Sequence, residues 1–568
     1  MILSHGSPVF EAASSATLPR SRNGGRLLVD GLRANGVDRI FCVPGESYLE
    51  VLDALYDTPE IELVVCRHEG AAANMAEADG KLTGRPGICF VTRALGATHA
   101  SAGVFTAFHD STPMILFVGQ VRKSFRQRGA FQELDLPAMF GGFTKWAAEI
   151  DQAERIPEFL SRAFNFALSG RPGPVVLSLP EDILAELSGA SDAGPSQVAQ
   201  SYPSAVDIEA VRAALATAQR PLLFLGGSGW TLEAGKDIRT FAEHYKLPVV
   251  SSFRRQDIFD NRHPNYAGHL TLGTSSALVK RVQDADLIIA LGTRLGDVPT
   301  SGYTLLQAPR PKQRLIHIHP DPAEIGRIFH ADVAICAAMP TAARALKDTM
   351  PVVASVWLSW LQEARDQFVS ASTPRPAKPD AGFVDLAQVI AHLNTELSDA
   401  DIIANGAGNY TVWLHRYFHY RQLGNELAPT SGSMGYGLPA AIAAKLRRPE
   451  STVVCLAGDG CFLMYPQELA TAMQNHAAII VIVVDNGMYG TIRMHQERRF
   501  PGRVSGTSIV NPNFVSLAKS FGAYAEAVTS TEDFASAFAR ARGAGKPALL
   551  ALTVDPNQIT PDWTLRGE

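Results

Sequence analysis

Two apolar segments near the carboxyl end of the chain are each followed by a loop that carries an oxygen-bearing side chain. Residues 452–456 lead into a Gly-Asp459-Gly loop, and residues 479–484 lead into Asn486. A Gly-Asp-Gly sequence alone is a common turn, but two oxygen ligands placed after two strands favour a metal site. Mg²⁺ takes one or two such oxygens and completes its coordination with phosphate oxygens and water. The pair therefore predicts a site for Mg²⁺ and a phosphorylated ligand.

Two further positions could take part in chemistry. Glu69 follows the apolar segment 62–66 and precedes a run of small residues, and Met434 precedes a second such run. A glutamate in this place is often only a favourable charge at a helix N-terminus, and a methionine often only fills a gap in a core. In a dry cleft, however, a carboxylate beside a ring nitrogen can relay a proton.

The segments that must position these residues alternate short apolar strands with longer amphipathic stretches. This pattern is typical of parallel sheets with helices on both faces. Both small-residue runs are followed by Arg-Pro and an apolar strand, which indicates a weak internal repeat. We therefore expect an α/β fold of three doubly wound parallel-sheet domains, in which the first and third domains resemble each other.

Two stretches of biased composition divide the chain. Residues 188–203 are rich in Ser, Gly and Ala, and residues 370–382 contain three prolines, Pro374, Pro376 and Pro379. Such segments are typical of linkers. We therefore expect a flexible N-terminal tail and three domains, with the boundaries 1–22, 23–187, 204–369 and 383–568.

The composition restricts the class of protein. Of the 568 residues, 46% are hydrophobic and 19% are charged, which is enough for buried cores. The 51 basic and 56 acidic residues are mixed along the chain, which argues against a nucleic-acid partner. The apolar segments are too short to span a membrane. The six cysteines show no metal-binding spacing, so we expect reduced thiols in a cytoplasmic protein.

Several motifs together resemble the acetolactate synthase large-subunit family of thiamine-diphosphate (ThDP) enzymes. The resemblance extends over nearly the whole chain after residue 22. The motifs include the Asp459–Asn486 pair, Arg67-His-Glu69, and the segments 41–45, 110–120, 130–133, 144–146, 171–174 and 435–441. The resemblance implies that the first domain binds the pyrimidine ring of ThDP and that the third binds its diphosphate.

The resemblance also implies roles for individual residues. Glu69 is expected to hydrogen-bond the aminopyrimidine ring and promote proton removal from C2 of the thiazolium ring. Met434 is expected to separate the two rings and hold the cofactor bent. Asp459, Asn486 and the carbonyl group of Met488 are expected to bind Mg²⁺. The remaining residues expected around the cofactor are Asn409, Tyr410, Gly432, Gly458, Gly460, Cys461 and Tyr489.

In this family the active sites lie between two chains. The resemblance therefore implies that Glu69 of one chain faces Asp459 and Met434 of the other. A homodimer would be the minimal active unit, and a homotetramer is the expected assembly.

The sequence departs from acetolactate synthases in the expected substrate pocket. Val298 stands where the family has an arginine that holds the carboxylate of the second 2-oxo acid, and His495 falls near a tryptophan that selects the acceptor. The loss of a charge-assisted contact would weaken acceptor binding unless Arg493 or His495 replaces it. Gln132 keeps the family pattern and is expected in the pocket.

The first domain departs from the family as well. Glu46 stands where acetolactate synthases have a glycine, as an acidic residue does in pyruvate decarboxylases. A carboxylic acid there could protonate the reacting carbon and release an aldehyde, or it could simply be a charge at a helix N-terminus. Farther along, the loop 93–96 reads Arg-Ala-Leu-Gly in place of Gly-Pro-Gly, and His99 replaces an asparagine.

The middle domain of the family binds FAD. The loops 226–229 and 292–294 are compatible with a nucleotide, whereas the stretch 268–274 differs from the flavin-contacting stretch of the family. Short glycine loops are weak signals by themselves. The sequence therefore leaves three alternatives open for the middle domain: bound FAD, another ligand in the same pocket, or an empty pocket.

We therefore expect a ThDP- and Mg²⁺-dependent decarboxylase or carboligase that acts on a 2-oxo acid, as acetolactate synthase does. The alternatives are a simple 2-oxo acid decarboxylase, an acyloin- or benzoin-type ligase of aldehydes, a diketone hydrolase and an acyl-CoA lyase. A ThDP-binding protein without activity is disfavoured because Glu69, Met434, Asp459 and Asn486 are all present.

Overall fold

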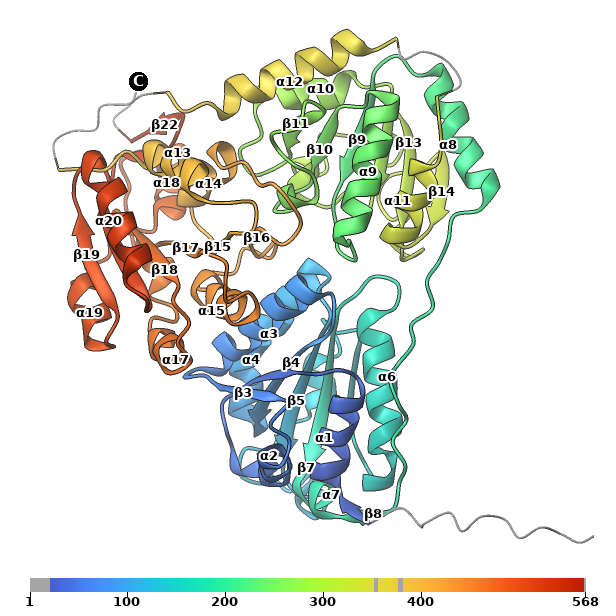
Figure 1. Ribbon diagram of the computed structural model, residues 1–568, viewed down its shortest axis with the longest axis vertical. Helices are drawn as coiled ribbons and strands as arrows, with labels where there is room; N and C mark the ends of the chain where they lie inside the picture. The colour runs from blue at the N-terminus through green and yellow to red at the C-terminus, as the bar shows by residue number, and fades with distance from the viewer. Residues whose placement is uncertain (1–20, 352–355, 376–381, 566–568) are drawn as a thin grey trace, which may run out of the picture.

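The computed structural model describes residues 21–351, 356–375 and 382–565. They form three lobes, each built on a six-stranded sheet in which all pairings are parallel. In Figure 1 the first domain lies at the bottom, the third at the upper left and the middle domain at the upper right. The expected α/β class with three parallel-sheet domains is therefore confirmed.

The first domain has the strand order β3-β2-β4-β5-β7-β6. Its strands are β2 (Arg39–Cys42), β3 (Glu62–Val65), β4 (Gly87–Thr92), β5 (Met114–Gln120), β6 (Trp146–Glu149) and β7 (Pro174–Pro180). Its helices are α1 (Gly24–Ala34), α2 (Leu49–Tyr56), α3 (Glu69–Thr83), α4 (Arg93–Asp110), α5 (Leu136–Phe140), α6 (Ile156–Leu168) and α7 (Glu181–Ala185).

The third domain repeats this order of strands as β16-β15-β17-β18-β20-β19. Its strands are β15 (Ile402–Asn405), β16 (Glu426–Leu427), β17 (Val453–Gly458), β18 (Ile480–Asp485), β19 (Tyr524–Val528) and β20 (Ala548–Thr553). Its helices are α13 (Leu386–Glu396), α14 (Tyr410–Tyr417), α15 (Gly437–Arg447), α16 (Asp459–Phe462), α17 (Glu468–Gln474), α18 (Gly490–Arg499), α19 (Phe514–Ser520) and α20 (Thr531–Gly543). The internal repeat seen in the sequence is thus a repeat of topology.

The middle domain has a different order, β11-β10-β9-β12-β13-β14. Its strands are β9 (Pro221–Leu225), β10 (Val249–Ser251), β11 (Tyr266–His269), β12 (Leu287–Leu291), β13 (Arg314–His319) and β14 (Val333–Cys336). Its helices are α8 (Ala205–Thr217), α9 (Leu232–Tyr245), α10 (Ser276–Asp284), α11 (Met339–Lys347) and α12 (Leu358–Ser372). This is the order of dinucleotide-binding folds, with the reversal between β9 and β12.

The elements next to the two expected linkers show where regular structure begins and ends. A two-residue strand, β1 (Arg22–Asn23), pairs with β8 (Leu187–Ser188), so the ordered first domain includes Arg22. The rest of the expected tail, residues 1–20, lies outside the described residues. Helix α12 continues to Ser372, into the stretch expected to be the second linker, whose Pro376 and Pro379 also lie outside the described residues.

The first and third domains share one hydrophobic core. Helices α3 and α15 pack against each other through alanines, and their buried side chains belong to a single cluster that joins the two sheets. The phenol group of Tyr436 donates a hydrogen bond of 2.5 Å to Glu77 across this contact. Small side chains let two helices approach closely. Figure 1 shows α3 and α15 as neighbours where the first and third domains meet. Among the described residues, no helix is both long and apolar enough to cross a membrane.

Candidate functional site

The expected metal-binding loops lie where the strand order of the third sheet reverses. Strands β15 and β17 are neighbours, and the loops after them contain Asn409 and Asp459. Strand β18 pairs with β17 on its other side and leads into Asn486. In parallel sheets, ligands bind at the carboxyl ends of the strands beside such a reversal. The fold therefore gathers the expected ligands at one edge.

The carboxylate of Asp459 is buried in this loop cluster. Its Oδ1 accepts a hydrogen bond of 2.7 Å from the amide of Gly460, and its Oδ2 accepts one of 2.9 Å from the amide of Gly487. Asn511 Nδ2 bridges Asp459 Oδ2 and Asp485 Oδ1 at 2.8 Å each. Burial raises the pKa of Asp459, and the charge of Asp485 acts in the same direction. A cation would relieve this accumulation of negative charge.

The second expected ligand lies in a tight turn beside Asp459. Asn486 Oδ1 accepts a 3.2 Å hydrogen bond from the amide of Met488, whose carbonyl group accepts one of 3.0 Å from Gly490. A Cβ atom at Gly460 would lie 2.6 Å from the ring of Tyr489. Glycine is therefore required at position 460 for the two loops to pack together.

Tyr410 supports the loop cluster from within. Its ring lies against Gly458, where a Cβ atom would come within 2.9 Å of it. Its hydroxyl group donates to Sγ of Cys461 at 3.3 Å and accepts from the amide of Gly406 at 3.1 Å. The buried phenol is thus already engaged by the protein. Asn409 accepts a 2.8 Å hydrogen bond from Thr491 at the start of α18.

Met434 lies between two glycines that adopt left-handed backbone conformations. The φ angles are 71° at Gly432 and 80° at Gly435, a region that favours glycine. A Cβ atom at Gly435 would lie 2.6 Å from Cβ of Met464. Met434 itself is half-buried and packs against the core of the third domain.

Glu69 is the first residue of α3, and its carboxylate contacts a histidine of α4. Glu69 Oε2 and His99 Nδ1 lie 2.9 Å apart. His68 caps the helix, because its Nδ1 accepts a 3.0 Å hydrogen bond from the amide of Gly70. The ring of His68 stacks on that of His99 at 4.8 Å and contacts Tyr465 at 5.1 Å. Burial lowers the pKa of His68, and His99 adds to this effect.

A buried glutamate that the sequence did not reveal lies next to this group. Glu468 accepts hydrogen bonds from the amide of Arg67 at 3.1 Å and from the hydroxyl of Thr471 at 2.6 Å. Burial raises the pKa of Glu468 to about 7. Its backbone donor Arg67 lies 401 residues away in the first domain, so no local sequence signal could have identified this contact.

Replacing Glu468 by glutamine should change how stability depends on pH. The carboxyl group has a pKa of about 7 when folded and an ordinary value of 4.5. Its ionisation therefore destabilises the folded protein progressively between these pH values and fully above pH 7. We expect Glu468→Gln to gain up to about 3 kcal/mol of unfolding free energy relative to wild type between pH 4.5 and pH 8.

Urea unfolding of both cofactor-free proteins at several pH values would measure this difference. The exposed Glu233→Gln is the matched control. A difference between Glu468→Gln and wild type that stays constant with pH would contradict the prediction.

The reversal point of the first sheet brings together Glu46 and Gln132. Glu46 follows β2, and its side chain is 71% exposed. Its Oε1 lies 3.5 Å from the guanidinium of Arg93, which follows β4 and also forms an ion pair with Glu181. The carbonyl group of Gln132 accepts a 3.2 Å hydrogen bond from the amide of Ala94. The segment that begins at Arg93 thus contacts both expected pocket residues, Glu46 through the Arg93 side chain and Gln132 through the amide of Ala94.

The other expected pocket residues lie in two different domains. Val298 begins a short 3₁₀ turn in the loops after β12. Arg493 and His495 lie on α18, where Arg493 forms a 2.7 Å ion pair with Glu497 and His495 is exposed. The guanidinium of Arg493 is therefore already paired within its own helix.

The reversal point of the middle sheet is closely packed at its base. Gly227 has a φ angle of 71°, and a Cβ atom there would lie 1.9 Å from the carbonyl oxygen of Gly292. Above this base, Arg171 and Arg327 form ion pairs with the buried Glu324 at 2.9 and 3.2 Å. Burial lowers the pKa of nearby Arg294 to about 10, and Arg171 adds to the effect. Arg171 and Arg294 also donate to the carbonyl groups of Phe108 and His109 at the end of α4, so these side chains connect the first and middle domains.

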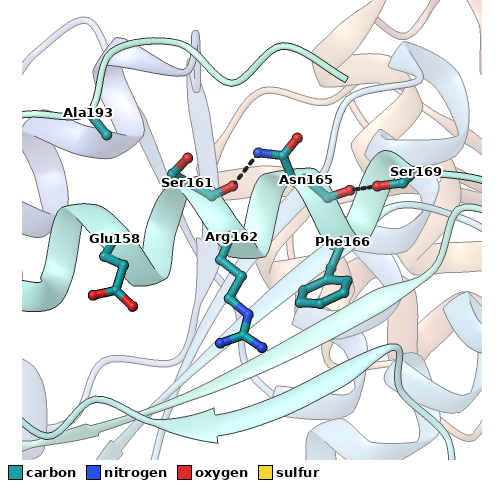
Figure 2. Close-up of a pocket in the computed structure, with 7 residues that line it drawn as sticks. All are labelled: Glu158, Ser161, Arg162, Asn165, Phe166, Ser169 and Ala193. Atoms are coloured by element: carbon teal, nitrogen blue, oxygen red, sulfur yellow. Dashed lines mark hydrogen bonds between the residues drawn. The ribbon is translucent and has the colours of Figure 1, made fainter. Parts of the chain in front are cut away.

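A hollow elsewhere on the first domain contains none of these residues. It lies along α6 beside the linker at Ala193, as Figure 2 shows. The guanidinium of Arg162 lies 4.6 Å from the ring of Trp146 and 5.3 Å from that of Phe166, so its stem and charge cover aromatic surface. None of the residues that line the hollow is an expected catalytic, cofactor-binding or metal-binding residue, and we assign it no function.

Comparison with known domain families gives three matches in chain order. Residues 22–139 match the family described as "Thiamine pyrophosphate enzyme, N-terminal TPP binding domain". Residues 208–346 match the central domain of such enzymes, and residues 406–552 match their C-terminal TPP binding domain. The fold and the site therefore define a ThDP-dependent enzyme.

Similarity to curated proteins covers almost the full length. The chain is 32% identical to the acetolactate synthase isozyme 2 large subunit of Escherichia coli, over 96% of this chain and 97% of that protein. It is 31% identical to the probable acetolactate synthase large subunit of Methanocaldococcus jannaschii, over 95% of this chain and 93% of that protein. It is 32% identical to the acetolactate synthase large subunit of Corynebacterium glutamicum, over 92% and 85% respectively. The chain belongs to the acetolactate synthase large-subunit family.

Proposed function

We propose that the protein is a ThDP- and Mg²⁺-dependent enzyme that decarboxylates a 2-oxo acid and ligates the remaining acyl unit to a carbonyl acceptor. The observation that carries this proposal is the buried, uncompensated carboxylate of Asp459 beside the Asn486 turn. In the described chain it has amide donors and Asn511 around it but no basic side chain within salt-bridge distance. Membership of the family supports the reaction class.

The donor set fits a magnesium diphosphate. Asp459 Oδ, Asn486 Oδ1 and the carbonyl oxygen of Met488 would supply hard oxygens, which Mg²⁺ prefers. Asn511 Oδ1 is buried without a hydrogen-bond partner among the described residues, so this oxygen is available to accept a hydrogen bond from a ligand or a metal-bound water. ThDP, when bound, supplies the electron sink that makes loss of CO₂ feasible. The chain would orient it, with Met434 held between its two glycines.

We propose that Glu69 completes the site of a second copy of the chain. Glu69 lies at the surface of the first domain, with its side chain 16% exposed. Three large apolar side chains are exposed in the single chain: Leu95 and Phe105 on α4, the helix that carries His99, and Met464, next in sequence to Tyr465. A second chain that covered them would bury apolar area and exclude water from the carboxylate. We therefore propose a homodimer as the active unit and a homotetramer as the assembly.

The expected pocket residues fit a 2-oxo acid better as the substrate that is decarboxylated than as the carbonyl compound that receives the acyl unit. Val298 offers no charge for a carboxylate, and Arg493 is paired with Glu497. An acceptor without a carboxylate, such as an aldehyde, needs no such clamp. Release of an aldehyde is the second candidate outcome, because Glu46 lies at the reversal point of the first sheet together with Arg93 and Gln132.

A product screen would test the proposed function. Purified protein with ThDP and Mg²⁺ would be incubated with aliphatic and aromatic 2-oxo acids, with and without added aldehydes. We expect release of CO₂ together with a hydroxyketone or an acetohydroxy acid. Failure to release CO₂ from any 2-oxo acid, with bound ThDP verified by calorimetry, would overturn the proposal.

Glu46→Gln should shift the ratio of products. If Glu46 donates the proton that releases an aldehyde, its removal slows that branch by about 100-fold, at the low end for a general acid, and leaves ligation unchanged. The measurement is the ratio of aldehyde to ligated product by NMR. The exposed Glu154→Gln is the control. An unchanged ratio in Glu46→Gln would show that the carboxylate serves only to pair with Arg93.

We also propose a nucleotide at the reversal point of the middle sheet, with FAD as the expected one. Arg294 has no carboxylate partner among the described residues and suits a diphosphate, whereas Arg171 and Arg327 are paired with Glu324. Gly229 and Gly296 have open space beside them. The absorption spectrum of the purified protein, and chromatography of the nucleotide released on denaturation, would identify the occupant. Absence of any released nucleotide would contradict this part of the proposal.

A further inference from the structure

His99, on α4, contacts the carboxylate of Glu69 on α3. His99 Nδ1 lies 2.9 Å from Oε2 of Glu69, the carboxylate proposed to act on the cofactor. One carboxylate oxygen is thereby engaged, and Oε1 remains available for another donor. A hydrogen bond to one oxygen restricts the rotation of a carboxylate and therefore the directions that its second oxygen can take.

The backbone holds His99 in this place. A Cβ atom at Gly70 would lie 3.0 Å from the carbonyl oxygen of His99, and one at Gly103 would lie 2.5 Å from Cβ of Ala73. Helices α3 and α4 are therefore in very close contact at the Glu69–His99 pair and one turn beyond it. The stacking of His99 on His68, which is itself the cap of α3, fixes the orientation of the ring.

We propose that His99 is a positioning residue, which holds the carboxylate of Glu69 through Oε2 so that Oε1 faces the ring nitrogen of the cofactor. This inference rests on the proposed function of Glu69. It deepens that function by naming the side chain that orients the carboxylate. His99 does not contact substrate in this scheme.

The surroundings of His99 separate this role from simple packing. Its side chain is 50% exposed, so its removal leaves no cavity in a core. His68 accepts from the amide of Gly70 through its Nδ1, so this nitrogen cannot act as a donor to Glu69. Loss of the His99 N–H would leave Glu69 Oε2 without a side-chain donor.

Three substitutions distinguish the hydrogen bond from the volume of the side chain. His99→Leu keeps the bulk but removes the donor, His99→Asn keeps a donor of smaller size, and His99→Ala removes both. We expect deuterium exchange at C2 of bound ThDP to slow by about tenfold or more in the Leu and Ala variants, the loss that goes with one oriented hydrogen bond to a charged group. We expect His99→Asn to stay within about threefold of wild type. The exposed His330→Asn is the control.

A second readout uses the protein without cofactor. Nitrogen-15 NMR of the imidazole groups reports which ring nitrogen carries the proton. If Glu69 accepts from His99, the Nδ1–H form predominates in wild type and loses this preference in Glu69→Gln. Equal exchange rates in the Leu and Asn variants, or an unchanged proton position in Glu69→Gln, would overturn the proposal. Absence of C2 exchange in wild type would instead count against the proposed function, while the NMR result would still decide the Glu69–His99 contact.

Discussion

Glu69→Gln slows deuterium exchange at C2 of bound ThDP by about 10³-fold, within the range of one general acid–base group. Glutamine has nearly the same shape as glutamate but can neither take nor give a proton. It also keeps a side-chain oxygen for the contact that Glu69 Oε2 makes with His99. The expected loss is therefore in proton transfer and not in the local fold. Quenched-flow exchange followed by proton NMR of the extracted cofactor measures it directly.

The control for this experiment is binding. Isothermal calorimetry should show that Glu69→Gln binds ThDP and Mg²⁺ within about tenfold of wild type, because one neutral hydrogen bond replaces a charge-assisted one. The variant Glu60→Gln, at an exposed position of the same domain, should match wild type in both assays. An exchange rate in Glu69→Gln equal to that of wild type would refute the proton-relay role.

Asp459→Asn is expected to weaken the joint binding of Mg²⁺ and ThDP by more than about 100-fold. The substitution removes the one buried carboxylate of the Gly-Asp-Gly loop and places an amide group where two backbone N–H groups already point. A neutral ligand attracts Mg²⁺ far less than a carboxylate does in a site shielded from water. Calorimetric titration of ThDP at fixed Mg²⁺ concentration gives the change in affinity.

A neighbouring carboxylate provides the matched control. Asp485 shares the donor Asn511 with Asp459, and its Oδ1 also accepts from the amide of Gly487 at 3.2 Å. We expect Asp485→Asn to lose much less affinity, because Asp485 is proposed to support the turn and not to bind the metal. Near-ultraviolet circular dichroism would establish that both variants are folded. Equal losses of affinity in the two variants would contradict the assignment of Asp459 as the metal ligand.

Periodicity in the sequence predicted the fold well, because parallel sheets covered on both faces require nearly continuous apolar strands. The strand that ends at Gly458 is an example, with five buried residues in succession before it ends. The end of the middle domain was placed less accurately. Ser370 lies in α12, whereas the nearby prolines suggested a linker, because the residues before those prolines pack against β11 and support a helix.

The candidate site was predicted where its residues lie close together along the chain. Asp459, Asn486 and Met488 follow adjacent strands, so their proximity follows from topology. The structure adds contacts between distant segments, such as Glu46 with Arg93 and Arg67 with Glu468. The burial of Tyr410 behind Gly458 is another such contact, and its role in cofactor binding remains a prediction that rests on the loop it supports. The first and last of these pairings depend on how distant loops pack within one domain, and the pairing of Arg67 with Glu468 depends on how two domains pack. A single sequence does not encode such contacts in any local pattern.

The shared strand order of the first and third sheets has a consequence for how this chain evolves. Equivalent positions in the two copies carry different chemistry: Glu46 and Asn409 follow the first strand, Glu69 and Met434 precede the helix after the second, and Arg93 and Asp459 follow the third. Because the proposed metal ligands all lie in the third domain, the loops at Glu46 and Arg93 of the first domain can change without altering them. Selection for a new substrate would then act mainly on the acidic and basic loops of the first copy, and loop exchange between relatives is best attempted there.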